Sequence, residues 1–549
     1  MLGRPTRRIL WVAVVSTAVL ASCRGNDEAA RETGSPGAVS TPVSGGIAVL
    51  GSISDVDSWN EYLSREAFAN SILRRIYLRL AREDGEDPST EPGFEPELAE
   101  SWEIAHDGLS ITFRLRDTSW SDGQPVTSND VRFTWLAQTH PDVAWAGASS
   151  KEFITDVEVV DPRTVIFHFD RVYPYQMIDA IDGGILPEHV FGKVPFDAWH
   201  SHPWSEAKIA SGPFLLEQHR PNEEIVLVRN PRYYGVDDIH LDGFVVRIVP
   251  DAINLLTQLR SGNIDYMENI QPRDAEAVDE DGDTSLLPFD SPGYHYIGWN
   301  GAREPFDDPE IRRALTMAID RQAIVEELLY GFGRVSAGPW PSHRWGADPG
   351  LEPLPYDPGA AKRILADRGY RLRNGVLEKD GHPFSFTMTT NAGNRVREEV
   401  LVKVQAQLAR LGIEVELEPL EMGAFRKKVG SGDYDSYVGG WVFAGKTELK
   451  VLFDSQAVPP NGLNMVAYRS GDVDRLLGHI GNAETHAQLQ PVLFEIQRQI
   501  HRDQPYTFLF ESKRLAGVGR RLEGVGIDAP ADPLRFLERA WMHVKTAAR

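Results

Sequence analysis

Two histidines in one segment come closest to a metal-binding pattern. A single serine separates His200 from His202, and this spacing can place both imidazoles on the same side of a loop. Structural and catalytic zinc sites recruit at least three protein ligands. Neither an adjacent cysteine nor an obvious third ligand follows the pair, so a solvated loop explains it better than a metal site.

Motifs for covalent or nucleotide chemistry are missing from the sequence. It contains no Gly-x-Ser-x-Gly elbow, no His-Glu-x-x-His helix and no phosphate-binding loop. With 80 Asp and Glu residues, a carboxylate pair could be nominated for acid/base catalysis by chance alone. We therefore predict no enzymatic activity, no cofactor and no bound metal. Capture of nickel through a chelating small molecule stays open.

The only cysteine, Cys23, stands at the end of a segment typical of secreted proteins. Arg4, Arg7 and Arg8 lie among the first eight residues, and residues 9–21 form a mostly apolar run that is short for a membrane-spanning helix. Leu20-Ala21-Ser22-Cys23 resembles a bacterial lipobox, which implies lipidation of Cys23 and cleavage before it. We expect a signal peptide over residues 1–22; an ordinary signal with an incidental cysteine is the alternative.

A tether should follow the modified cysteine. Residues 23–45 contain mainly Gly, Ser, Pro, Thr, Ala and charged residues, and such a composition cannot build a core. A disordered chain of this length reaches roughly 25 Å. Later in the sequence, no stretch approaches the length of uninterrupted apolar residues that a spanning helix needs. We expect a folded body outside the membrane, anchored through Cys23 in the periplasm or at the cell surface.

Composition narrows the class of partner. The chain has 549 residues, 42% of them hydrophobic, and a formal net charge of −23. It is long enough for two or three packed units. Phosphate backbones repel an acidic surface, which makes nucleic acid a poor partner.

The periodicity of apolar residues predicts an α/β fold. Strands are expected at residues 47–50, 110–116, 156–160, 164–169, 243–249, 413–417 and 434–441, and helices at 67–80, 251–259 and 396–411. Asp251, Asp308 and Asp320 are predicted helix N-caps, and Gly412 is predicted to end a helix. Two α/β lobes are the simplest division, with the chain crossing near Asn300 and returning near Glu511.

One run of motifs is similar to a known family. Residues 96–102 read Pro-Glu-Leu-Ala-Glu-Ser-Trp, residues 113–116 read Phe-Arg-Leu-Arg, and residues 120–123 read Trp-Ser-Asp-Gly. Shorter matches follow at residues 185–190, 211–214, 228–234, 262–266, 311–321 and 356–361. This pattern resembles the family 5 extracellular solute-binding proteins, the oligopeptide, dipeptide and nickel type, from about residue 46 to the C-terminus.

The resemblance implies a bilobal periplasmic-binding-protein type II fold of the large class, with a cleft between the lobes. Lobe 1 would span residues 46–299 and include an extra subdomain at about 60–205. Lobe 2 would span 300–511, and residues 512–549 would return to lobe 1. A cleft of this kind can bury most of a small ligand, and its closure gives a partner a ligand-dependent shape to recognise.

The function implied by the resemblance is capture of a peptide-like or other small solute. The chain would act as the substrate-binding lipoprotein of an ABC importer and deliver the solute to permease subunits that work with a separate ATPase. We expect a monomer. A sensory lipoprotein that binds solute without transport is the alternative, and a surface hydrolase is a further one.

Ligand residues are also carried over from the resemblance. In peptide-binding members, an aspartate that follows a Trp-rich strand end pairs with the α-ammonium group of the ligand. Trp441 matches the tryptophan, but the expected carboxylate position falls on Ala444 or Gly445, which leaves Glu448 as a speculative substitute. The ligand could then be a modified or cyclic peptide, a sugar or an opine.

Other aromatic and amide residues are candidates for the cleft. Trp441 could form a stacking wall for the ligand or a core residue. Trp299 and Asn300 would lie near the hinge, where packing explains them equally well, and Trp59 and Asn60 follow the first strand. The predicted ligand-binding set is Trp441, Asn300, Trp299, Trp59, Asn60, Phe443, Trp340 and Asn464.

Overall fold

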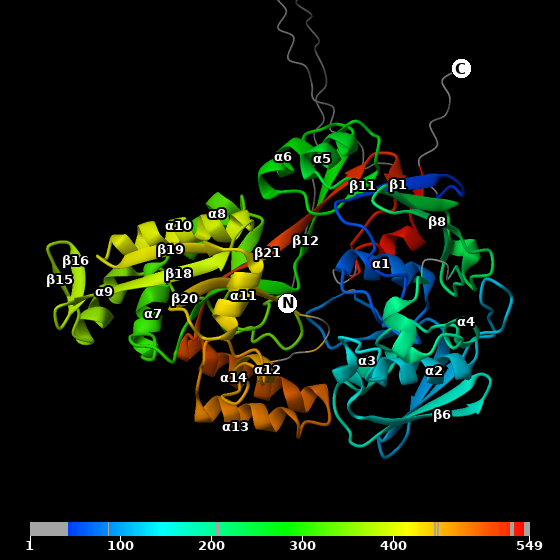
Figure 1. The fold of residues 1–549 in the computed structure, drawn as a ribbon, viewed down its shortest axis with the longest axis horizontal. Helices are drawn as coiled ribbons and strands as arrows, with labels where there is room; N and C mark the ends of the chain where they lie inside the picture. The colour runs from blue at the N-terminus through cyan, green and yellow to red at the C-terminus, as the bar shows by residue number, and fades with distance from the viewer. Residues whose placement is uncertain are drawn as a thin grey trace, which may run out of the picture. The chain divides into compact units, whose positions relative to one another are not determined.

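The fold is organised around one long strand, β21 (Tyr506–Gly519), which belongs to two groups of strands. The structure is a computed structural model that describes residues 42–85, 87–204, 208–443, 446, 449–527 and 532–542. The predicted signal peptide, Cys23 and most of the tether lie outside these residues, as do Ala444, Gly445 and Glu448. Twelve strands of the described residues form one sheet that passes through β21 (Figure 1).

The first group of strands lies on the C-terminal half of β21. Its order is β8 (Phe214–Arg220), β9 (Glu224–Arg229), β10 (Gly243–Ile248), β1 (Ile47–Ser52) and β11 (Tyr266–Met267). Strand β1 runs parallel to both β10 and β11, whereas β11 pairs antiparallel with β21. Alternate residues of β1, Ala48 and Leu50, are almost completely buried, as the side-chain period of a strand requires.

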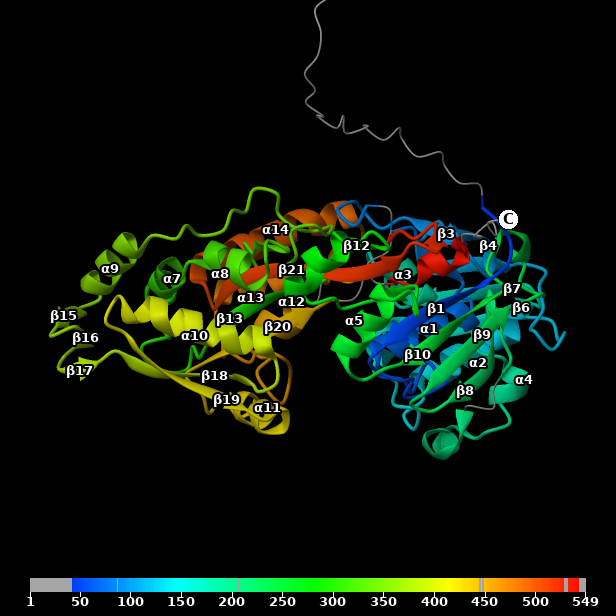
Figure 2. The same ribbon diagram turned by 90° about the horizontal axis from the view of Figure 1, so that it is seen from above.

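The second group lies on the N-terminal half of β21. Its order is β19 (Glu414–Leu420), β18 (Ser385–Asn391), β20 (Ser436–Val442) and β13 (Gly293–Trp299), with β14 (Gly333–Val335) also paired to β21. Strand β18 runs parallel to β19 and β20, and β13 runs antiparallel to β20 and β21. Figure 2 shows β21 extending from this group to β1 and its neighbours.

The chain passes between the two groups at two adjacent segments. Strand β12 (Thr284–Asp290) pairs with residues 513–519 of β21, and β13 pairs with residues 506–510. Ser291 and Pro292 connect β12 to β13. The sequence prediction ends the first part of lobe 1 at residue 299, which places β13 in lobe 1. In the structure, β13 pairs with β20 and with the N-terminal half of β21, both in the second group of strands. The change from one group to the other therefore falls at Ser291, before Asn300.

The predicted helix starts are confirmed by side-chain hydrogen bonds. Asp251 accepts from Asn254 N at 2.7 Å at the start of α5 (Ala252–Arg260), and Asp308 accepts from Glu310 N at 2.9 Å at the start of α7 (Pro309–Ala318). Asp320 caps α8 (Arg321–Leu328) in the same way. These carboxylates satisfy backbone N–H groups that have no partner within the helix.

A separate four-stranded sheet lies within the predicted extra subdomain. Its order is β4 (Ala99–Ile104), β5 (Ser110–Leu115), β7 (Thr164–Phe169) and β6 (Ile154–Asp161). Around it lie α2 (Ser128–Thr139), α3 (Gln176–Ile181) and α4 (Glu188–Phe191). The β6–β7 hairpin is the one predicted from the sequence.

Helices and short strands complete the described chain. In or near the first group these are α1 (Ala67–Ile76), β2 (Ala81–Glu83), β3 (Phe94–Pro96), α6 (Ala275–Asp279), β22 (Leu522–Glu523) and β23 (Trp541–Met542). In the second they are α9 (Pro358–Asp367), β15 (Arg371–Arg373), β16 (Val376–Lys379), β17 (His382–Pro383), α10 (Arg395–Ala409), α11 (Met422–Gly430), α12 (Leu449–Phe453), α13 (Gly471–Ile480) and α14 (His486–Asp503).

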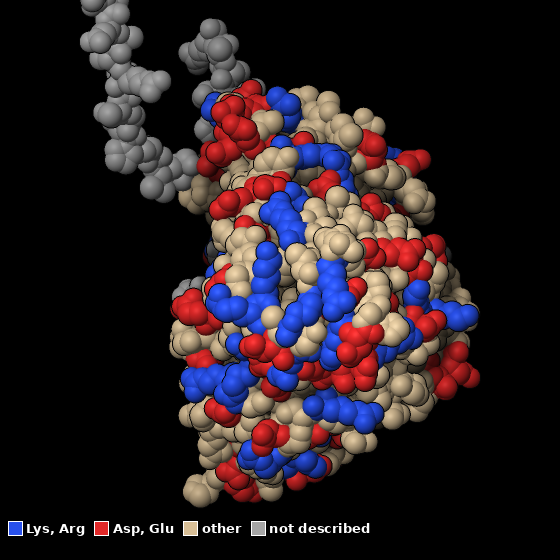
Figure 3. All heavy atoms as spheres, turned by 90° about the vertical axis from the view of Figure 1, so that its left-hand side faces the viewer, with Lys and Arg blue, Asp and Glu red and all other residues tan. Residues whose placement is uncertain are grey.

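Charged side chains of both signs cover the end of the second group. Figure 3 shows basic and acidic residues interspersed on this face. Arg373 and Glu378, for example, lie 3.3 Å apart on β15 and β16. Across the part of the chain that the structure describes, no helix has the length and apolar character needed to cross a membrane.

Candidate functional site

A cluster of aromatic side chains gathers where β13, β20 and β21 lie side by side. Tyr294 and Tyr296 of β13 face the same side because they are two residues apart, and Tyr506 and Phe508 of β21 contact them. The rings of Tyr296 and Tyr506 stack with centroids 4.0 Å apart. We use the name aromatic cluster for Tyr294, Tyr296, Trp340, Trp441, Phe443, Tyr506 and Phe508.

Three predicted ligand residues belong to this cluster. Phe443 packs on Trp340 and on Tyr294, with ring centroids 4.7 and 5.7 Å apart respectively. Trp441 stacks on Tyr296 at 6.1 Å and donates its indole N–H to the Tyr506 hydroxyl at 3.4 Å. Trp441 is only half-buried, unlike its neighbours. Part of its ring surface therefore stays exposed.

Tyrosine hydroxyls lie within the aromatic cluster and beside it. The hydroxyls of Tyr296 and Tyr437 lie 2.9 Å apart, while the buried hydroxyl of Tyr294 has no hydrogen-bond partner among the described residues. Burial raises the pKa of Tyr294, Tyr296 and Tyr437 well above that of a free phenol. These phenols are consequently neutral near pH 7 and can donate or accept hydrogen bonds.

Trp299 lies on the opposite side of β13 from the aromatic cluster. It is 0% exposed and stacks on Phe306 at 5.2 Å. Its indole N–H donates to Thr507 Oγ1 at 3.0 Å. Ile297 and Trp299 of β13 pack in the buried core of the second group of strands, away from the aromatic cluster.

The side chains of the two predicted asparagines of lobe 2 form hydrogen bonds with backbone groups. Asn300 Nδ2 donates to the carbonyls of Gly432 and Tyr434 at 3.1 and 2.7 Å. Asn464 Nδ2 donates to the carbonyls of Asp454 and Tyr468, and its Oδ1 accepts from Tyr468 N. Both side chains hold loops together, and the structure does not bring them into the aromatic cluster.

Trp59 and Asn60 belong to lobe 1, in the segment after β1. Trp59 donates its indole N–H to His219 Nδ1 at 3.1 Å, and His219 Nε2 lies 3.0 Å from the Asp55 carboxylate. Burial opposes ionisation of Asp55, yet hydrogen bonds from Asn222 N and His219 lower its pKa below that of a free aspartate. Asn60 is fully buried and accepts from Tyr62 N at 3.0 Å. This chain of polar contacts fixes the segment on β8.

Side chains of lobe 2 contact lobe 1 directly. Lys446, three residues beyond Phe443, forms an ion pair with Asp179 on α3. His486 at the start of α14 lies 3.0 Å from Glu91, and its ring meets Tyr175 edge-on at 5.5 Å. Sequence reasoning missed Asp179 and Lys446, because no local pattern marks a charge pair that joins two distant segments.

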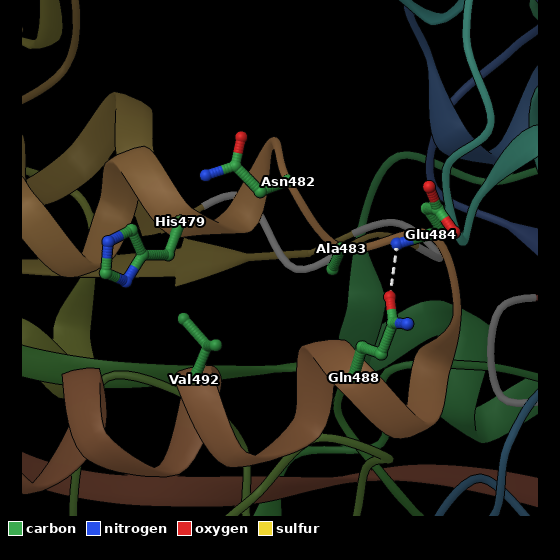
Figure 4. Close-up of a pocket in the computed structure, with 6 residues that line it drawn as sticks. All are labelled: His479, Asn482, Ala483, Glu484, Gln488 and Val492. Atoms are coloured by element: carbon green, nitrogen blue, oxygen red, sulfur yellow. Dashed lines mark hydrogen bonds between the residues drawn. The ribbon is translucent and has the colours of Figure 1, made fainter.

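Two hollows elsewhere in the described chain do not include the aromatic cluster. One, of about 360 Å³, lies between α13 and α14 and is lined by polar and apolar residues (Figure 4). Within it, Glu484 N donates to Gln488 Oε1 at 2.8 Å. The other, of about 210 Å³, lies beside Trp299 and Arg312. The Arg312 guanidinium donates hydrogen bonds to backbone carbonyls, among them that of Phe306 at 2.7 Å, and so stabilises the fold.

The histidine pair is exposed on a loop. His200 and His202 lie at the end of a short 3₁₀ turn, and the ring of His202 packs edge-on against Trp204. Within the described residues, no group of three or more His, Cys, Asp and Glu side chains is arranged to hold a metal ion.

Comparison with known proteins gives a consistent result. Residues 93–452 match the model of the bacterial extracellular solute-binding proteins, family 5. The chain is 30% identical over 547 residues to the oligopeptide-binding protein AppA of Bacillus subtilis, covering 97% of this chain and 98% of that protein.

Solved structures share the fold. The structure of Bacillus subtilis AppA in complex with a nonapeptide is similar with a TM-score of 0.74 and 29% identity, over 92% of this chain and 100% of that one. NikA from Brucella suis in complex with Fe(III)-EDTA has a TM-score of 0.79 and 21% identity, over 91% and 100% of the two chains. The fold is therefore the bilobal type II periplasmic-binding-protein fold predicted from the sequence. The chain belongs to the bacterial extracellular solute-binding proteins of family 5.

Proposed function

We propose that this protein is the substrate-binding subunit of an ABC importer and captures a peptide or peptide-like solute between its lobes. The carrying observation is the pair of adjacent crossing segments, at Ser291 and Ser512, that connect two groups of strands. Two such crossings let lobes rotate about one line, which is the movement that encloses a ligand. The family membership supports this assignment.

The aromatic cluster is the proposed wall of the solute site in lobe 2. Half-buried Trp441 offers a flat apolar face, and the phenols below it offer polar groups. Aromatic faces contribute large contact area at small cost in conformational entropy. Such a wall suits a peptide backbone with varied side chains. The nonapeptide bound to the related AppA agrees with this class.

The anchor is proposed to be a lipid on Cys23. The motif Leu20-Ala21-Ser22-Cys23 carries this part of the proposal. Two or more acyl chains give stable membrane attachment. Replacement Cys23→Ser should release the protein from membranes and abolish labelling with radioactive palmitate. Wild-type protein that takes up no palmitate, or C23S protein that is still labelled, would contradict the lipid anchor.

The partners are proposed to be permease subunits and a separate ATPase, with this protein acting as a monomer. The test is uptake in the source cell. Purified protein should show thermal stabilisation with members of a tripeptide to nonapeptide library. Linkage gives about 2.7 kcal/mol when free ligand is about 100 times its dissociation constant. Deletion of the gene should then abolish uptake of the same peptide.

The outcomes separate the candidate functions. Binding with unchanged uptake after deletion favours a sensory receptor. Sustained cleavage of the peptide by the purified protein establishes a hydrolase. Either result would replace the importer assignment.

A further inference from the structure

A buried carboxylate in lobe 1 is neutralised by a lysine from lobe 2. Asp179 on α3 has a side chain that is 1% exposed. Its Oδ2 accepts a hydrogen bond from the Tyr173 hydroxyl at 2.7 Å. Its Oδ1 has only the ammonium group of Lys446 as a partner among the described residues. A buried carboxylate is costly unless a cation or several donors face it.

The cations that lobe 1 itself supplies near Asp179 are directed at other groups. Lys151 is 2% exposed and directs its ammonium to the backbone carbonyls of Asp179 and Asp182, the latter at 2.9 Å. Arg79 lies 3.1 Å from Glu61 and 3.9 Å from Asp182. Among the described residues, neither Lys151 nor Arg79 forms an ion pair with the Asp179 carboxylate, whereas Lys446 of the other lobe does.

The Asp179–Lys446 pair cannot persist through an opening of the lobes. Lys446 stands three residues beyond Phe443 in the sequence, after the end of β20, and we assign it to lobe 2 with the aromatic cluster. Separation of the lobes withdraws its ammonium and leaves Asp179 Oδ1 without a cation. Burial already raises the pKa of Asp179, against the opposing effect of Lys446 and Tyr173. Without Lys446, the Asp179 carboxylate can then pair with another cation that fits the space left by the lysine.

We propose that Asp179 is the acceptor for an ammonium or guanidinium group of the solute, and that Lys446 occupies this position when the solute is absent. This inference rests on the proposed solute-binding function and assigns the charge of the solute. The sequence positions at which a ligand-pairing carboxylate is expected, Ala444 and Gly445, carry no acid. The anionic group is instead placed on lobe 1, and lobe 2 contributes a cation of its own.

The charge site can be tested without knowing the solute. Lys446→Ala removes the tethered ammonium and leaves space for a free one. The probe is n-butylammonium at millimolar concentration, with n-butanol as its neutral counterpart. The melting temperature of K446A should rise saturably with n-butylammonium and not with n-butanol. Wild type and D179N/K446A should show no such rise.

Lys450→Ala is the matched control, because Lys450 is an exposed lysine four residues further on. K450A should behave as wild type. Circular dichroism establishes that each variant is folded before melting. Equal melting of K446A and wild type, with no response of K446A to n-butylammonium, would overturn the assignment of Asp179 as a cation site.

A second measurement separates this inference from the proposed function. A peptide that stabilises wild type is compared with its N-acetylated form, in wild type, K446A and D179N. Acetylation and D179N should each weaken binding about 30-fold or more, which is typical for loss of one partner of a buried charge pair. K446A should bind the free peptide more tightly. Peptide binding that is indifferent to both changes contradicts the role of Asp179 and leaves the receptor function intact.

Discussion

The backbone N–H of Ser291 donates to the carbonyl of Ser512 at 3.1 Å and joins the two segments that connect the lobes. Next to this bond, Glu511 accepts from Ser342 N and Oγ at 3.0 and 2.8 Å, and it lies 3.6 Å from His343 Nδ1. Glu511 is only 3% exposed. The crossing is therefore held by a buried carboxylate and a backbone hydrogen bond.

Glu511→Gln should reduce the free energy of unfolding. The glutamine amide has a nitrogen donor in place of one carboxylate oxygen and carries no charge. The Ser342 N–H therefore loses its charge-assisted hydrogen bond to residue 511. Such a loss costs about 1–3 kcal/mol. Urea unfolding followed by tryptophan fluorescence measures it. Ser342→Ala, which removes only the hydroxyl bond to the same carboxylate, should cost at most about 1 kcal/mol. Equal stability of E511Q and wild type would contradict a role of the Glu511 carboxylate in holding the crossing.

Replacement of Trp299 by alanine should mainly reduce stability, whereas replacement of Trp441 should mainly weaken binding of the solute. W299A leaves a cavity in a sealed core and should cost about 3–5 kcal/mol of unfolding free energy. W441A removes a half-buried ring and should cost less, while it weakens binding of a stabilising peptide. Urea unfolding and calorimetric titration of both variants separate the two effects. If W299A impairs binding at unchanged stability, the assignment of Trp299 to the core is wrong.

Asp55 should contribute to stability in a pH-dependent way. Its pKa is lowered in the folded state, so the contribution is complete above the ordinary aspartate pKa of about 3.9. It is lost as pH falls through the lower folded value. Wild type should therefore lose more stability than D55N between pH 5 and the acid limit of folding, as measured by thermal melting. D237N, at an exposed aspartate, is the control and should follow wild type. A D55N profile parallel to wild type would contradict this role.

Local chemistry made much of the fold predictable. Asp251, Asp308 and Asp320 begin helices because a carboxylate followed by apolar positions is a start signal that needs no tertiary information. Gly412 adopts a positive φ of 80°, the conformation that a glycine at a helix end permits. Both signals operate within a few residues, so the sequence alone contains them.

The candidate site was less predictable because it depends on which side of each strand is buried. Every residue of β13 after His295 is buried, so the sequence shows no alternation that would separate Tyr296 from Trp299. The side-chain amides of Asn300 and Asn464 donate hydrogen bonds to backbone carbonyls. The residue type alone does not distinguish this structural role from ligand binding. The Asp179–Lys446 pair depends on the meeting of two lobes and leaves no local pattern.

Native mass spectrometry of gently purified protein tests whether this two-lobed protein captures one small solute. We expect a copurifying small molecule in a one-to-one complex. It should carry a positively charged group and should be lost when W441A disrupts the aromatic cluster. Protein that never carries a molecule from its source cell, and that no member of a broad peptide and amine panel stabilises, would contradict solute capture.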